Sequence, residues 1–163
     1  MISLFQQPEY VHALVQPVLT HALPLGALAL IMAFLLRSRR ALAVALAVTF
    51  LSSAAVLPTV HFGRAGADRI QAASDEVGGQ WLKVHKQRAE SLLWIFVATA
   101  AAAAAALVLI WKWPRLGKVL AALACALAIS ASAAGAYIAK AGGQIRHREF
   151  RDKPPPAVKA KPD

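Results

Sequence analysis

Four long stretches without a charged side chain constrain this chain more than any other feature. They cover residues 10–36, 41–60, 91–111 and 119–139. Each stretch reaches the roughly 20 residues that a helix needs to cross a bilayer, and is about twice the length of a barrel strand. Because backbone groups in lipid must be satisfied within the segment, the spans must be helical. The sequence predicts an all-α, four-helix transmembrane bundle within residues 1–152, the first span beginning near residue 15.

The composition agrees with a membrane protein. Apolar residues make up 58% of the chain, above the roughly 45–50% of soluble domains. The net charge of +10 comes from Lys and Arg scattered among connections and tail, which indicates anchors at lipid headgroups rather than a nucleic-acid surface. Cys125 is the single cysteine and lies inside a span, so the chain has no intramolecular disulfide and no CxxC motif.

The ionisable residues divide between two faces once the spans are drawn. The connections 37–40 and 112–118 share one face and contain only Lys and Arg as ionisable residues. The N-terminal segment, the middle segment 61–90 and the tail share the other face, with all eight Asp and Glu and all five His. Any chemistry is therefore expected at this second face.

The basic residues also suggest an orientation in the membrane. Arg37, Arg39 and Arg40 form a dense connection and no Lys or Arg precedes the first span, so the positive-inside rule predicts a cytoplasmic connection and periplasmic termini. The twelve Lys and Arg of the opposite face count against this orientation. Without a basic segment before it, the first helix does not have the form of a cleavable signal and is expected to be retained.

Small residues predict close packing of the third and fourth spans. The third span contains seven consecutive alanines at 100–106, between Trp94 and Trp111. These tryptophans suit opposite membrane interfaces. The fourth span has small residues at Ala122, Ala126, Ser130 and Ala134. Small residues let helix backbones approach closely in lipid, although alanine is also simply the best helix former.

The middle segment is too long for a bare turn. Its polar part, 68–77, predicts a short interfacial helix, and the third helix is expected to be wound after Gln80. The tail 153–163 is rich in Pro and Lys and predicts disorder. A faint duplication relates HFGRAG at 61–66 to YIAKAG at 137–142, which is typical of two related hairpins.

Three histidines are the main candidate site. His21, His61 and His85 fall at one depth on the second face, and imidazoles from facing helices can bind haem b or a transition metal. Pro24 is expected to bend the first span beside His21 and shape a pocket. The residues expected to surround such ligands are Asp75, Glu76, Arg88 and Glu90.

Other interpretations of the histidines stay open. His61 and His85 lie near the membrane boundary, where an imidazole is stable among headgroups, and no short ligand motif joins any two histidines. His12 and His147 are weaker candidates. Glu9 and His12 have the Glu-x-x-His spacing of di-iron bundles, but those bundles need the motif twice.

The sequence contains no enzyme signature, neither a GxSxG elbow nor a nucleotide-binding loop. The middles of spans two to four carry no charge, unlike those of coupled transporters. The function predicted is a non-enzymatic membrane protein that binds haem or a metal and passes electrons. The alternative is an accessory or scaffold subunit that binds a second copy or another membrane protein through the small residues of spans three and four.

The segment AGGQIRHREF and the His and Pro of the first span resemble a family of small four-span bacterial membrane proteins grouped as a domain of unknown function. The resemblance implies the same architecture in a bacterial cytoplasmic membrane. This sequence departs from the family at 21–26, where HALPLG stands in place of a longer motif that contains His and Pro. The motif that it nominates consists of Gly142, Gly143, Arg146, His147 and Glu149.

Overall fold

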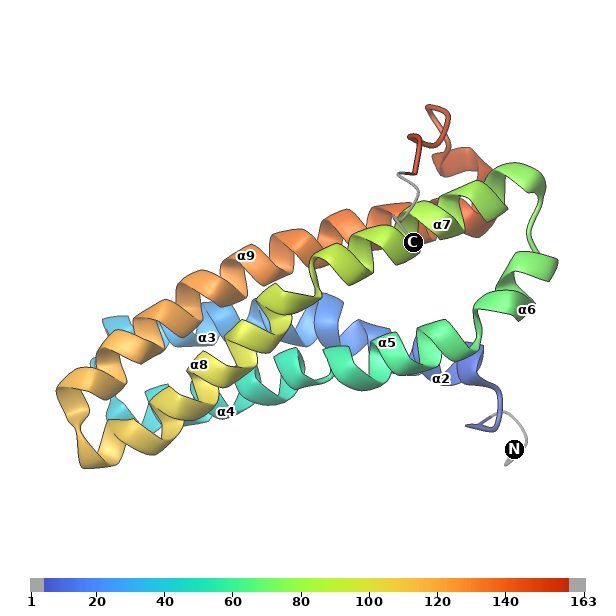
Figure 1. Ribbon diagram of the computed structural model, residues 1–163. Helices are drawn as coiled ribbons and strands as arrows, with labels where there is room; N and C mark the ends of the chain where they lie inside the picture. The colour runs from blue at the N-terminus through green and yellow to red at the C-terminus, as the bar shows by residue number, and fades with distance from the viewer. Residues whose placement is uncertain (1–4, 159–163) are drawn as a thin grey trace.

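The computed structural model describes residues 5–158, which fold into four long helical rods joined by short connections (Figure 1). The rods are Pro8–Leu35, Arg39–Ala65, Glu76–Lys112 and Pro114–Arg146, and each is long and apolar enough to cross a membrane. The predicted four-span, all-α architecture is confirmed. The protein is a four-span membrane protein.

Prolines divide the first two rods. The first consists of α2 (Pro8–Pro17), a π-helical segment (Val18–Ala22) and α3 (Leu23–Leu35). The distortion lies immediately before Pro24, as expected, because proline lacks the N–H that continues the ladder. The second rod consists of α4 (Arg39–Ala54) and α5 (Val56–Ala65). Its break precedes Pro58, which cannot donate to the carbonyl four residues earlier.

The middle segment differs in detail from the prediction. The short helix between spans two and three is α6 (Ala67–Ala72), and α7 (Glu76–Ser91) begins earlier than Gln80. The reason is Asp75, whose side chain accepts a hydrogen bond from the N–H of Gly78 at 2.8 Å and caps the helix.

The remaining elements complete the last two rods. They are α8 (Leu93–Lys112), α9 (Pro114–Arg146) and a 3-10 turn (Arg148–Phe150). Residues 151–158 follow without helix or strand. The rest of the tail that is predicted to be disordered, 159–163, lies outside the described residues.

The third and fourth rods pack closely through alanine, as predicted, but on another face of α9. Ala103 and Ala106 of α8 and Ala121 and Ala124 of α9 are fully buried and share one core with Leu30, Leu46 and Ile110. Of the small residues named by the prediction, Ala122, Ala126 and Ser130 are exposed on the outside of α9, and only Ala134 is half-buried against the core. An alanine-rich helix has no strong amphipathic pattern, so its sequence did not indicate which face would pack.

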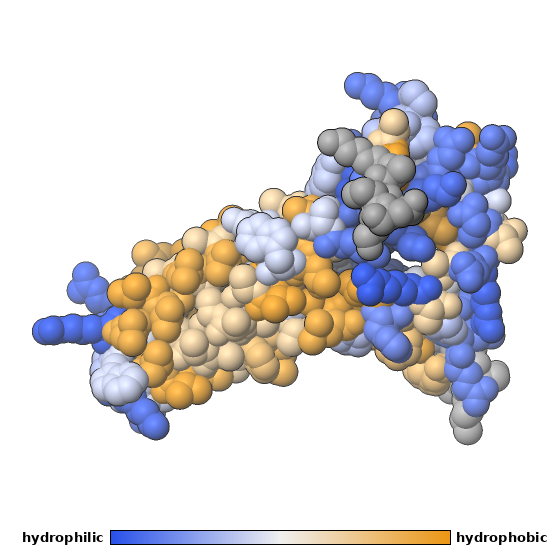
Figure 2. Space-filling view, in the orientation of Figure 1, coloured by the Kyte–Doolittle hydropathy of each residue, from blue (hydrophilic) through white to orange (hydrophobic). Residues whose placement is uncertain are grey.

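The surface has the banding of a membrane protein. Apolar side chains cover the bundle, and hydrophilic side chains lie at both ends (Figure 2). Trp94 and Trp111 are exposed, and the Arg39 guanidinium lies 5.8 Å from the ring centre of Trp111. The two short cationic connections lie together at one end of the bundle, opposite α6 (Figure 1).

The rods separate beyond the bundle into two arms (Figure 1). The first arm consists of α2 packed on α5, and the second of α7 packed on the last turns of α9. Helix α6 joins the far ends of the arms. The two arms and α6 together are called the fork. The fork carries the carboxylates and histidines of the described residues.

Candidate functional site

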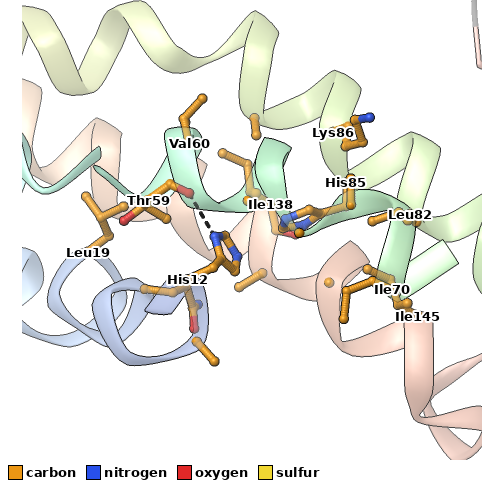
Figure 3. Close-up of a pocket in the computed structure, with 18 of the residues that line it drawn as sticks. His12, Leu19, Thr59, Val60, Ile70, Leu82, His85, Lys86, Ile138 and Ile145 are labelled. Atoms are coloured by element: carbon orange, nitrogen blue, oxygen red, sulfur yellow. Dashed lines mark hydrogen bonds between the residues drawn. The ribbon is translucent and has the colours of Figure 1, made fainter. Parts of the chain in front are cut away.

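A cavity of about 500 Å³ lies between the two arms. Its size falls within the roughly 300–1,000 Å³ of small-molecule and cofactor sites. The two arms, α6 and the adjoining end of the bundle contribute its apolar walls (Figure 3). The walls include Leu19, Val56, Val60, Ile70, Leu82, Phe96, Ile138 and Ile145.

Two imidazoles, one from each arm, face this cavity. His12 belongs to α2 and His85 to α7. Their ring centres are 6.4 Å apart and their planes are nearly perpendicular, at 89°. The fork therefore brings together two potential ligands that are 73 residues apart in the sequence.

The His12 ring is held by α5. Its Nδ1–H donates to the carbonyl of Thr59 at 2.8 Å (Figure 3). The ring lies directly on Gly63, where an added Cβ would meet Nδ1 at 2.8 Å. A glycine is therefore needed at 63 for the ring to lie where it does.

The His85 ring is held by α9 in the same way. Its Nδ1–H donates to the carbonyl of Ile138 at 3.0 Å. The ring lies on Gly142, where a Cβ would meet Nδ1 at 3.1 Å. Because a carbonyl only accepts, each Nδ1 carries the proton, and in the neutral ring Nε2 keeps its lone pair. Neither Nε2 has a hydrogen bond within the described residues.

The two hairpins thus repeat one unit. In each, the carbonyl that accepts from the histidine lies four residues before the glycine that touches its ring: Thr59 and Gly63, then Ile138 and Gly142. The sequence comparison of 61–66 with 137–142 matched Gly66 with Gly142, which is three residues out of register. The contact pattern therefore repeats in a register other than the one that the sequence comparison gave, and the duplication itself stays a prediction.

Charged residues surround the cavity. The Arg64 guanidinium of α5 donates to Glu90 of α7 at 3.2 Å and so joins the two arms. Arg69 donates to Glu9 at 3.1 Å on the first arm. Lys86 and Arg146 also line the cavity.

The structure brings His85, but neither His21 nor His61, into this cavity. His21 is exposed, and its Nδ1 lies 2.9 Å from the hydroxyl of Thr20 and 3.2 Å from the carbonyl of Pro17. His61 is exposed beside Phe62 and lines a separate surface groove. The residue paired with His85 is His12, the weaker candidate of the sequence.

The residues expected around the ligands serve other contacts. Asp75 accepts from Arg151 at 2.8 Å, and this bond, followed by the Gly78 N–H, lowers the pKa of the Asp75 carboxyl to about 2. Arg88 donates to the carbonyl of Tyr137 at 2.9 Å. Neither these residues nor Glu90 bonds to His12 or His85 in the described structure, and Glu76 does not line the cavity.

The C-terminal motif divides between the site and the end of the chain. Gly142 supports His85, and Arg146 lines the cavity. Gly143 also lines the cavity and is close to Phe150. The side chains of His147 and Glu149 bond to each other at 3.0 Å. Only part of the motif therefore belongs to the site.

Protein side chains alone do not form a metal-ion site here. Within residues 5–158 no group of three or more His, Cys, Asp or Glu is placed to hold an ion. A tetrahedral or octahedral ion needs more ligands than two imidazoles supply. A planar macrocycle that carries its own four nitrogen ligands needs only the two axial ones.

Comparison with protein-family models, curated proteins and solved structures finds no match for this chain. The four apolar helices agree with the family that the sequence resembles, and membership of that family stays a prediction.

Proposed function

We propose that this protein binds one b-type haem between His12 and His85 and carries electrons at one face of a bacterial cytoplasmic membrane. The observation that carries the proposal is the facing pair of imidazoles, whose ring centres are 6.4 Å apart. Two imidazoles at this separation would hold one iron between them, with the porphyrin supplying the other ligands.

The hydrogen bonds of the pair support the same assignment. A metal-bound histidine usually donates its other ring N–H to a carbonyl or carboxylate, which fixes the tautomer and the ring orientation. His12 and His85 make this bond to Thr59 and Ile138 and leave Nε2 without a hydrogen bond in the described structure. The ligands would therefore be oriented before haem binds.

The chemistry of the donor set favours electron transfer. Bound haem would supply a one-electron iron couple. His12 and His85 would hold the haem, and the function that we propose for it is electron transfer rather than an enzymatic reaction. By the positive-inside prediction, the fork and both termini would face the periplasm.

Spectroscopy of detergent-solubilised protein tests the proposal. We expect a Soret band and a low-spin ferric EPR signal of the strongly anisotropic type given by crossed imidazole planes, because these stand at 89°. His12→Ala and His85→Ala should each abolish the low-spin signal, while the matched controls His21→Ala and His61→Ala should retain it. A colourless protein after haem supply, or loss in the controls alone, would overturn the assignment.

The second candidate is an accessory subunit of a membrane complex or a homodimer. The observation that favours it is the stripe of small residues Ala122, Ala126 and Ser130, exposed on the outside of α9, where another helix could approach closely. Substitution of Ala126 by Leu should then disrupt copurification with a partner or the dimer, and unchanged association would exclude this surface.

A further inference from the structure

The cavity has more positive charge than its own carboxylates neutralise. The carboxylates of Glu9 and Glu90, which line it, each already accept from an arginine, at 3.1 and 3.2 Å. Lys86 and Arg146 also line it and have no ion pair within residues 5–158. Two cations without a carboxylate partner thus lie beside an otherwise apolar cavity.

We infer that Lys86 and Arg146 bind the two propionate groups of the haem and so select a dianionic porphyrin. This inference rests on the proposed function. It follows from matching charge: the apolar walls suit a macrocycle, and the two cations equal in number the two carboxylates at one edge of haem b.

The positions of the two residues suit this role. Lys86 follows the ligand His85 on α7, and Arg146 ends α9, so both belong to the second arm. Both residues line the same cavity as His12 and His85, where the haem would be held. Both side chains are exposed, long and flexible, and can place a charged end at the edge of the macrocycle while the stem covers apolar surface.

Titration with haem b and with its dimethyl ester, which lacks both negative charges, tests the inference. Wild-type protein should bind haem b roughly 25-fold more tightly than the ester, about fivefold for each of the two ion pairs. Lys86→Met and Arg146→Met keep most of the aliphatic stem, and each should weaken haem b binding about fivefold, the upper range for exposed ion pairs, without changing affinity for the ester. Lys83→Met on α7 and Lys140→Met on α9 alter exposed residues outside the cavity and serve as controls.

The outcomes separate the two proposals. Equal affinity of wild-type protein for both porphyrins, or an unchanged preference in the Lys86→Met and Arg146→Met double variant, would overturn the propionate assignment while the low-spin spectrum persists. Absence of that spectrum with either porphyrin would overturn haem binding itself. The spectrum of the ester complex also reports whether each variant keeps an intact pocket.

Discussion

The bundle and the fork use small residues for opposite purposes. In the bundle, Ala103 and Ala124 are fully buried, and their small size brings α8 and α9 together. In the fork, Gly63 and Gly142 lie under imidazole rings, and their lack of a side chain gives the rings room. The same kind of residue therefore closes a helix interface at one end and positions ligands at the other, depending on what lies opposite.

The largest expected effect is a loss of stability when a buried alanine of the bundle is enlarged. Ala124→Leu places a larger side chain where no space remains and should lower the free energy of unfolding by about 1–3 kcal/mol. Ala122→Leu, on the exposed face of the same helix, should change it little. Thermal unfolding in detergent measures both, and equal effects would contradict the assigned packing face.

The next effect concerns the fork. Gly63→Ala would bring Cβ to 2.8 Å from Nδ1 of His12, so the ring must move and the bond to Thr59 weakens. Loss of such a supporting bond typically costs 10–100-fold in metal affinity, and we expect about tenfold weaker haem binding.

Two further glycine substitutions give a scale for the change in haem affinity. Gly142→Ala should have a smaller effect, since its Cβ would lie at 3.1 Å from His85. Gly135→Ala also adds a methyl group to the cavity wall, but at an ordinary 3.8 Å from Phe96 and not against either imidazole, so it is the matched control for moving the rings. If all three variants bind haem alike, the glycines do not position the rings.

The bundle could be predicted from the sequence and the fork could not, for a physical reason. Span length and hydropathy are local properties, and they give four helices wherever about twenty apolar residues run together. The bonds of the site are not local: His12 and Thr59 are 47 residues apart, and His85 and Ile138 are 53 apart. They depend on where the rods separate, which no local pattern encodes.

One signal in the sequence did point to the site, in the wrong register. The likeness of 61–66 to 137–142 placed related glycines in both hairpins, but it paired Gly66 rather than Gly63 with Gly142. In the structure Gly66 lies against the backbone of Glu9. Matching each glycine with the histidines of the preceding rod would have nominated His12 and His21 beside His85.

A smaller effect is expected at the end of the second arm, where Asp75 binds Arg151 and caps α7. The pKa of Asp75 is about 2 in the folded protein, below the 3.8 that is ordinary for an aspartate. The ionised carboxyl therefore stabilises the folded protein above about pH 4, and this stabilisation is lost as the pH falls through about 2. Protection from hydrogen exchange in the first turn of α7, relative to the intrinsic exchange rate, should fall over that range, and Asp75→Ala, which removes the capping oxygen, should show low protection at every pH. The same pH response in the variant would assign it to another group.

The smallest effect is expected from Arg64 and Glu90, the ion pair that joins the arms. Their side chains are 60% and 50% exposed, and exposed pairs contribute only about 0.2–1 kcal/mol. Glu90→Gln should leave thermal unfolding nearly unchanged. It should raise the rate of haem dissociation about two- to threefold, because the ion pair that joins the arms is lost. High salt should raise the wild-type rate by a similar factor and the variant's rate less. A tenfold increase in the variant would mean that little else holds the two arms together, and that the arms move about a hinge rather than forming a fixed cleft.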